Sequence, residues 1–275
     1  MCFKKLAIVF LLQLSFSLCN GQSVLLTHGV DTSAGDGLTY IITTSSAVYY
    51  LEKEGGGLSS MMDRDGIDWI GFHNKKGSGW KGEYRGFPNA IHRQDGNYFH
   101  AMNDGTEPST SVIEIESQNH VRIVFTSNNE QWQGQWDFYP DRCDFSMIKV
   151  SAGYKYWVQY EGVPGGEMDS TDFWYSSANT KKHPIEEPFF GDLPAPEWMA
   201  FGDENSARML YMLHHEDDEH PDNFVSRPYM TVFGFGRQNK ETTSKFLSTV
   251  QTFSIGFVES TEYSVISQAI RRILD

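Results

Sequence analysis

The feature that most constrains this chain is a succession of short runs rich in Val, Ile, Thr, Tyr, Phe and Trp, separated by clusters of Gly, Asn and Asp. Branched and aromatic side chains favour strands, and the clusters favour turns. In the run 120–127, Val121, Ile123 and Phe125 fall on one face of a strand. The expected strands are 38–44, 47–52, 111–116, 120–127, 131–139, 145–150, 155–160, 207–213, 230–235 and 246–257.

Many short strands with regular turns predict an all-β sandwich or barrel rather than βαβ units. The sequence shows no repeat of about 20–50 residues, which argues against propellers and solenoids. The C-terminus differs, because apolar residues from Val265 to Leu274 follow helical spacing. We therefore predict one short C-terminal helix, capped by Ser260 or Thr261.

One long segment, 162–197, lacks clear strand signals and holds five of the ten prolines. Loops of this length in compact domains are usually functional. We expect either a lid over a binding site or an excursion that covers a sheet edge.

The N-terminus has the pattern of a secretory signal peptide. Lys4 and Lys5 precede the apolar run 6–18, and small Gly21 follows. We predict a signal peptide over 1–21 and a single secreted or periplasmic domain over 22–275; the alternatives are an uncleaved anchor and a lipoprotein attached through Cys19. The mature chain then keeps one cysteine, Cys143, which we expect to be a buried structural thiol.

The charge balance limits the partners. The chain has 22 basic and 36 acidic residues, a formal net charge of −14. A field of that sign repels nucleic-acid phosphates and anionic lipid headgroups. We therefore expect neither a nucleic-acid partner nor a membrane span.

The run 55–72 consists of a glycine turn, a strand, an Asp-Gly hairpin and a second strand. This plan resembles the early hairpin of galactose-mutarotase-like β-supersandwich proteins, which include sugar mutarotases and sandwich domains of polysaccharide lyases. The resemblance implies a β-supersandwich of antiparallel sheets that handles carbohydrate. The two histidines and late glutamate of the mutarotases have no match here, so the resemblance implies fold more than activity.

The same hairpin carries Asp63, Asp65 and Asp68, which also resemble the start of a calcium-binding loop. The glutamate that completes such a loop is missing, and an Asp-Gly turn explains the pattern by itself. We expect a turn, with calcium as the alternative and no other metal or cofactor.

The richest chemistry lies in the run 80–93, which holds an aromatic residue for sugar stacking, two proton-transfer groups, two guanidinium groups and an amide. These are Trp80, Tyr84, His92, Arg85, Arg93 and Asn89. Arginine suits planar recognition of a sugar carboxylate. An ordinary inter-strand loop is the alternative interpretation.

Two later places add candidates. Glu161 directly follows the aromatic strand 154–160 and precedes a Gly/Pro turn. His214 and His215 end another strand, and Arg227 and Tyr229 begin the next; if these two strands form a hairpin, the four side chains share one end of the sheet.

Together these residue types favour a polysaccharide lyase that cleaves a uronic-acid-containing glycan by β-elimination. A glycoside hydrolase, a mutarotase-like isomerase and a non-catalytic glycan-binding protein are the alternatives. The expected catalytic residues are Tyr84, His92, His214, His215 and Tyr229. The expected substrate-binding residues are Trp80, Arg85, Asn89, Arg93, Glu161 and Arg227. The expected partner is a polysaccharide or oligosaccharide.

Overall fold

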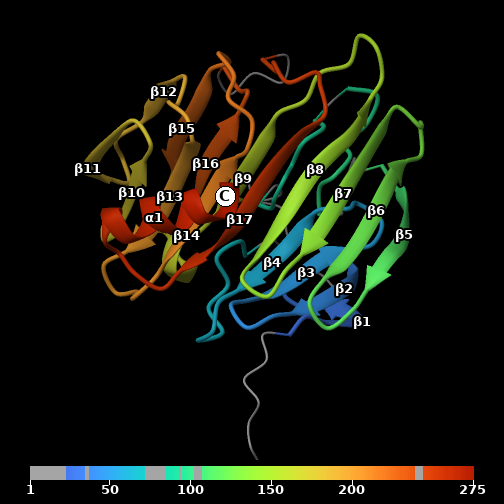
Figure 1. Cartoon of the computed structure of the whole chain (residues 1–275), viewed down its shortest axis with the longest axis horizontal. Helices are drawn as coiled ribbons and strands as arrows, with labels where there is room; N and C mark the ends of the chain where they lie inside the picture. Colours follow the sequence, from blue (N-terminus) through green and yellow to red (C-terminus); the bar gives the residue numbers. More distant parts are fainter. Residues whose placement is uncertain (1–22, 35–36, 72–84, 93, 102–106, 239–243) are drawn as a thin grey trace, which may run out of the picture.

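The computed structural model describes residues 23–34, 37–71, 85–92, 94–101, 107–238 and 244–275 (Figure 1). These residues form antiparallel strands in three sheets, with one short 3-10 turn and one C-terminal α-helix. The structure thus confirms the predicted all-β, sandwich-like class. No helix of the described residues is long and apolar enough to cross a membrane.

One layer of the sandwich is a nine-stranded antiparallel sheet. In spatial order its strands are β11 (Asn179–Pro184), β10 (Asp172–Ser176), β13 (Glu197–Asp203), β14 (Met209–His214), β17 (Gln251–Val258), β8 (Arg142–Val150), β7 (Trp132–Phe138), β6 (Val121–Ser127) and β5 (Ser109–Glu116). The expected alternation in β6 is confirmed, because Val121, Ile123 and Phe125 are fully buried while the residues between them are half-exposed.

The second layer contains two four-stranded sheets. The first consists of β1 (Leu25–Asp31), β2 (Gly37–Thr43), β3 (Val48–Glu52) and β4 (Leu58–Met62). The second, in spatial order, consists of β12 (Phe189–Gly191), β15 (Asp222–Arg227), β16 (Met230–Phe235) and β9 (Val158–Gly162). Bridges from Phe87 to Leu58 and from Gly86 to Glu161 connect the two sheets, so the second layer is continuous.

The main core lies between these layers and is largely aromatic. Tyr49 and Phe138 approach across it with a ring-centroid distance of 5.3 Å, and Phe201 and Phe233 with one of 6.2 Å. Cys143 is buried in the same core, as expected for a structural thiol. Burying this much apolar surface is the dominant favourable term in folding.

The C-terminal helix α1 (Tyr263–Leu274) covers the opposite face of the nine-stranded sheet. Ile266 and Ile270 are fully buried there beside Phe173 and Tyr211. The predicted cap is wrong, because the helix begins at Tyr263 and has no side-chain cap. Ser260 instead accepts a hydrogen bond from the backbone N–H of Glu262, just before the helix.

The expected long loop over 162–197 is largely strand. It contains the 3-10 turn η1 (Pro164–Gly166), β10, β11 and β12. β10 and β11 form one edge of the nine-stranded sheet, and β12 forms an edge of a four-stranded sheet. The segment therefore forms sheet edges itself, and the expectation of a loop that covers an edge is wrong. Composition did not predict these strands, because they are determined by pairing with strands distant in the sequence, such as that of Asp172 with Asp203.

We predict that Ile270→Ala lowers the free energy of unfolding by about 2–4 kcal/mol, because it leaves a cavity between α1 and the sheet. Urea unfolding followed by circular dichroism measures this. Val265→Ala, on the same helix but 44% exposed, is the matched control and should change stability little. Equal effects of the two substitutions would show that α1 is not held by its buried face.

Candidate functional site

The candidate site lies on the outer face of the second layer. Along β9, Tyr160 points inward and packs on Phe201, with a ring-centroid distance of 5.5 Å. Side chains alternate along a strand, so Glu161 points outward. Val232 pairs with both Glu161 and Val225, which places the outward residues of β9, β16 and β15 side by side.

A segment with special backbone geometry adjoins β9. The backbone N–H of Glu161 donates to the carbonyl of Gly86 at 2.9 Å, and that of Gln159 donates to Pro88 at 2.7 Å. The peptide bond before Pro88 is cis, and Asn89 has φ 41°, a left-handed conformation that asparagine tolerates. The Asn89 amide donates a hydrogen bond to Glu161 Oε2 at 2.8 Å.

Glu161 has an unusual electrostatic environment. Its side chain is buried, and burial raises its pKa to about 7. Arg237, Arg227 and the hydrogen bond from Asn89 act in the opposite direction, since they favour the ionised form. A carboxyl with a pKa near neutrality is suited to general acid–base chemistry.

Sequence analysis did not identify two buried basic side chains, Arg237 and Lys245. Both lie near the ring of Trp157, and Arg237 also acts on the carboxyl of Glu161. Arg237 is 2% exposed; its Nη1 donates to Asn223 at 3.1 Å, and its Nε has no hydrogen-bond partner among the described residues. Burial lowers the pKa of Arg237 to about 10. Lys245 donates to the carbonyl of His92 at 2.6 Å, and burial lowers its pKa to about 8. The guanidinium carbon of Arg237 lies 5.6 Å from the Trp157 ring centroid, and the Lys245 ammonium lies 5.2 Å from it.

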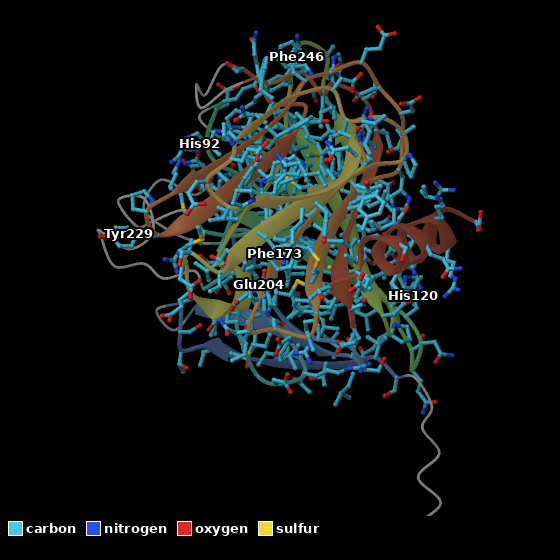
Figure 2. The ribbon with its side chains drawn as sticks, turned by 90° about the vertical axis from the view of Figure 1, so that its left-hand side faces the viewer. His92, His120, Phe173, Glu204, Tyr229 and Phe246 are labelled. Carbon is cyan, nitrogen blue, oxygen red and sulfur yellow. The ribbon has the colours of Figure 1, made fainter. Side chains whose placement is uncertain are left out.

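The structure brings Arg85 and the Arg227–Tyr229 segment together. Arg85 donates to the backbone carbonyls of Gly71 at 3.0 Å and Tyr229 at 2.8 Å. Tyr229 is 60% exposed in the turn between β15 and β16. Figure 2 shows His92 and Tyr229 on the side of the molecule opposite α1. Trp80, Tyr84 and Arg93 lie outside the described residues.

His92 lies at the edge of this group. Its ring stacks on Trp157 at a centroid distance of 6.4 Å, and His100 lies 5.9 Å away. His100 is buried, and burial holds its pKa well below the usual range. His92 is therefore half-buried against an aromatic surface close to the basic groups.

His214 and His215 lie elsewhere. His214 points into the core, where its Nδ1 lies 2.6 Å from Glu197 and its ring stacks on Phe253. His215 points to the other face and hydrogen-bonds Ser254 at 2.6 Å. The hairpin on which the expected grouping depended does not form, because β14 and β15 belong to different sheets.

The Asp-Gly hairpin is an ordinary turn. Asp63 accepts hydrogen bonds from the backbone of Asp65 and Ile67, and its other oxygen accepts one from the Trp69 indole. Arg208 also forms an ion pair with Asp63 at 2.6 Å. Because protein donors occupy both oxygens of Asp63, the hairpin does not present it to a cation.

No family model and no curated protein match the chain. Among solved structures, the crystal structure of HI1317 is similar at 12% identity with a TM-score of 0.56, over 86% of this chain and 99% of that one. A galactose mutarotase related enzyme from Lactobacillus acidophilus is 10% identical, with a TM-score of 0.49 over 82% of this chain and 99% of that one. An alpha-galactosidase from Lactobacillus brevis is 11% identical, with a TM-score of 0.45 over 85% of this chain and 41% of that one. The likeness to HI1317 shows a shared fold.

We predict that Glu161→Gln removes part of the pH dependence of stability. The folded-state pKa of about 7 exceeds the ordinary value of 4.5, so the native state binds the proton more tightly than the unfolded chain does. The wild type therefore loses stability as the pH rises from about 4.5 to about 7, by up to about 3 kcal/mol, whereas the variant does not. Urea unfolding at pH values across this window measures the difference.

The matched control is Glu116→Gln, which changes an exposed carboxyl on β5. Its free energy of unfolding should stay parallel to that of the wild type at every pH. A constant difference between Glu161→Gln and the wild type across the window would show that Glu161 titrates normally.

Proposed function

We propose that this protein is a carbohydrate-active enzyme that cleaves a uronic-acid-containing glycan by β-elimination. The observation that carries the proposal is the outward-facing Glu161, buried beside Asn89 and within the electrostatic influence of Arg227 and Arg237. This arrangement combines a proton-transfer group with guanidinium groups that can receive a sugar carboxylate.

The local charge supports an anionic substrate. Arg227 and Arg237 contribute two positive charges that act on the carboxyl of Glu161. The chain as a whole has a net charge of −14, so this region opposes the global field. A basic surface within an acidic protein concentrates anions locally.

The proposed reaction needs no redox partner. Arg227 and Arg237 neutralise the uronate carboxylate, which makes the proton on the adjacent carbon more acidic. Glu161 in its ionised form takes that proton, the released electron pair forms a carbon–carbon double bond, and the glycosidic carbon–oxygen bond breaks. The leaving oxygen then receives a proton from a general acid, for which we propose His92.

The remaining sequence-derived candidates keep supporting roles in the proposal. Arg85 links Gly71 to the Tyr229 turn and so shapes one side of the site. Trp80 and Arg93 belong to the same run of the chain as Arg85 and are proposed as substrate contacts, and Tyr84 of that run is proposed as a further catalytic residue. His214 and His215 are not part of the proposed mechanism, because neither interacts with Glu161.

The surroundings of Glu161 favour elimination over hydrolysis. Glycoside hydrolysis ordinarily uses two carboxylates that flank the scissile bond. Within the described part of the chain, the side chains that shift the pKa of Glu161 are two arginines and an amide, with no second carboxylate.

The proposal includes export from the cytoplasm. Its support is the basic and apolar pattern of residues 1–21, which would leave 22–275 as one secreted or periplasmic domain. An extracellular or periplasmic location would give the enzyme access to polymeric glycans.

We predict that the wild type, incubated with a panel of uronic-acid polysaccharides, produces the ultraviolet absorbance of an unsaturated uronate. Glu161→Gln should lower the turnover number by about 10²–10⁴-fold, because the amide cannot accept the proton. Arg237→Lys should mainly raise KM, since lysine keeps the charge but lacks the fork of donors. Glu116→Gln is the control and should behave as the wild type.

The other outcomes identify the alternatives. New reducing ends without the absorbance would indicate a hydrolase, and interconversion of free sugars without chain cleavage would indicate an isomerase. Binding of a polymer with no new ends would indicate a glycan-binding protein. Full activity of Glu161→Gln would overturn the assigned role of Glu161.

A further inference from the structure

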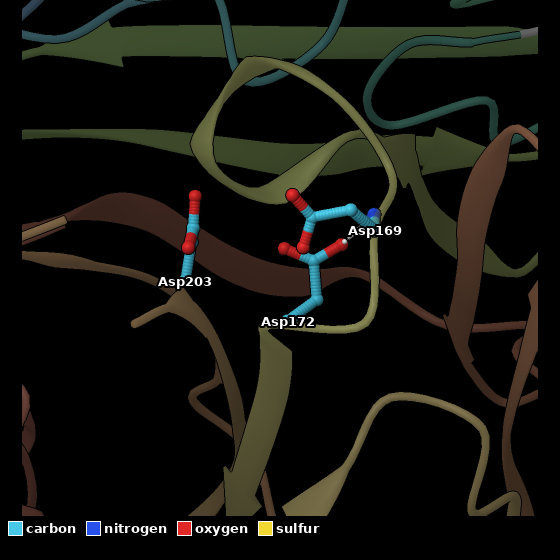
Figure 3. Close-up of side chains that lie close together, drawn as sticks. All are labelled: Asp169, Asp172 and Asp203. Carbon is cyan, nitrogen blue, oxygen red and sulfur yellow. Dashed lines mark hydrogen bonds between the residues drawn. The ribbon is translucent and has the colours of Figure 1, made fainter. Parts of the chain in front are cut away.

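Three aspartates meet beside the candidate site. Asp169 lies in the connection after η1, Asp172 begins β10, and Asp203 ends β13 directly opposite Asp172. Figure 3 shows the three carboxylates gathered at one place, and one oxygen from each lies within 4.8 Å of the others. Strand pairing therefore holds two of the carboxylates together, and the connection adds the third.

The buried member of this group has an unsatisfied oxygen. Asp172 is 2% exposed, and its Oδ2 accepts a hydrogen bond from the backbone N–H of Asp169 at 3.0 Å. Its Oδ1 is inaccessible to solvent and has no hydrogen-bond partner among the described residues. In Figure 3 that oxygen is directed toward the other two carboxylates. Burying an unpaired carboxylate oxygen is costly, so the arrangement indicates a missing partner.

The other two aspartates share this pattern. Asp169 Oδ1 accepts hydrogen bonds from the backbone and hydroxyl of Thr171. Asp203 Oδ1 accepts from the Thr171 hydroxyl and from the backbone N–H of Asn205, both at 2.8 Å. The second oxygen of each receives no hydrogen bond from the described residues, and no Lys, Arg or His of those residues forms an ion pair with the three.

We propose that Asp169, Asp172 and Asp203 bind a calcium ion. Calcium takes six to eight oxygen ligands at about 2.3–2.6 Å in flexible geometry, so oxygens up to about 5 Å apart can share one ion. The donors here are all oxygens, which disfavours zinc, and they come from a connection and two strand ends rather than from an octahedral cage, which disfavours magnesium. Backbone carbonyls and water would complete the coordination.

The position of this site gives it a role beyond stability. The connection that carries Asp169 starts at the end of β9, after Gly162, which follows Glu161. Asp169 and Arg227 line the same surface pocket, of about 320 Å³. A bound cation would fix the connection and thereby the wall of the pocket that adjoins Arg227. The site would exist whether or not the proposed lyase activity is correct.

The test uses the full mature chain, freed of metal with a chelator and then titrated with calcium chloride. We expect calorimetric binding with a Kd of roughly 10⁻³ M or tighter and a rise in the melting temperature that saturates with calcium. Asp169→Asn should weaken binding by about tenfold or more, and Asp172→Asn should do the same. Magnesium at equal concentration should raise the melting temperature less.

A second acidic group provides the matched control. One oxygen each of Asp192, Glu197 and Asp218 also lies within 4.8 Å of the others, and Asp218 Oδ2 is likewise buried with no hydrogen-bond partner among the described residues. The most buried member, Glu197, differs from Asp172, because both of its oxygens have partners, His214 and the backbone of Asp218. Asp192→Asn should therefore leave calcium binding unchanged. Because Asp169 is exposed, Asp169→Asn should fold even if Asp172→Asn does not.

Two results would overturn the proposal. The first is no calcium binding to the wild type at millimolar concentrations, which would mean that Asp172 is protonated instead. The second is equal binding by the wild type and Asp169→Asn, which would place the ion elsewhere. Loss of calcium binding in the control Asp192→Asn alone would likewise place the ion elsewhere.

Discussion

The backbone pairing of residues 86–90 with β9 is the interaction on which the rest of this structure depends. It joins the two four-stranded sheets into one layer, through Phe87 on one side and Gly86 on the other. The same pairing places Asn89 where its amide reaches Glu161. One set of hydrogen bonds therefore completes the sandwich and builds the candidate site, so a loss of pairing would affect both.

Local patterns predicted the fold class but only part of the strands. Alternation in β6 and helical spacing in α1 were readable because each encodes a face that is buried. β10 was not readable, since every residue of it is buried and its sequence lacks alternation. Pairing with β13, more than 20 residues away in the chain, determines that strand.

The candidate site was predictable where chemistry clusters in sequence. Arg85, Asn89, Glu161 and Arg227 were expected as substrate contacts, and the structure groups them on or beside one face. Arg237 and Lys245 were not found, because neither lies in a motif and only the tertiary fold buries them. The prediction that His214 and His215 belong to the site was wrong for the opposite reason. They lie in a dense polar motif at a strand end, but His214 packs into the core and His215 lies on the outer face of the sheet.

Burial of Glu161 ties stability to chemistry. Burial disfavours the ionised form of this carboxyl and raises its pKa. The nearby arginines favour the ionised form but offset only part of this effect, so the pKa lies near 7. Complete pairing with an arginine would lower the pKa and stabilise the fold, but it would also remove the proton affinity that a general base needs. Arg237 instead donates a hydrogen bond to Asn223 and favours the ionised form of Glu161 only through space, so the carboxyl keeps a pKa near neutrality.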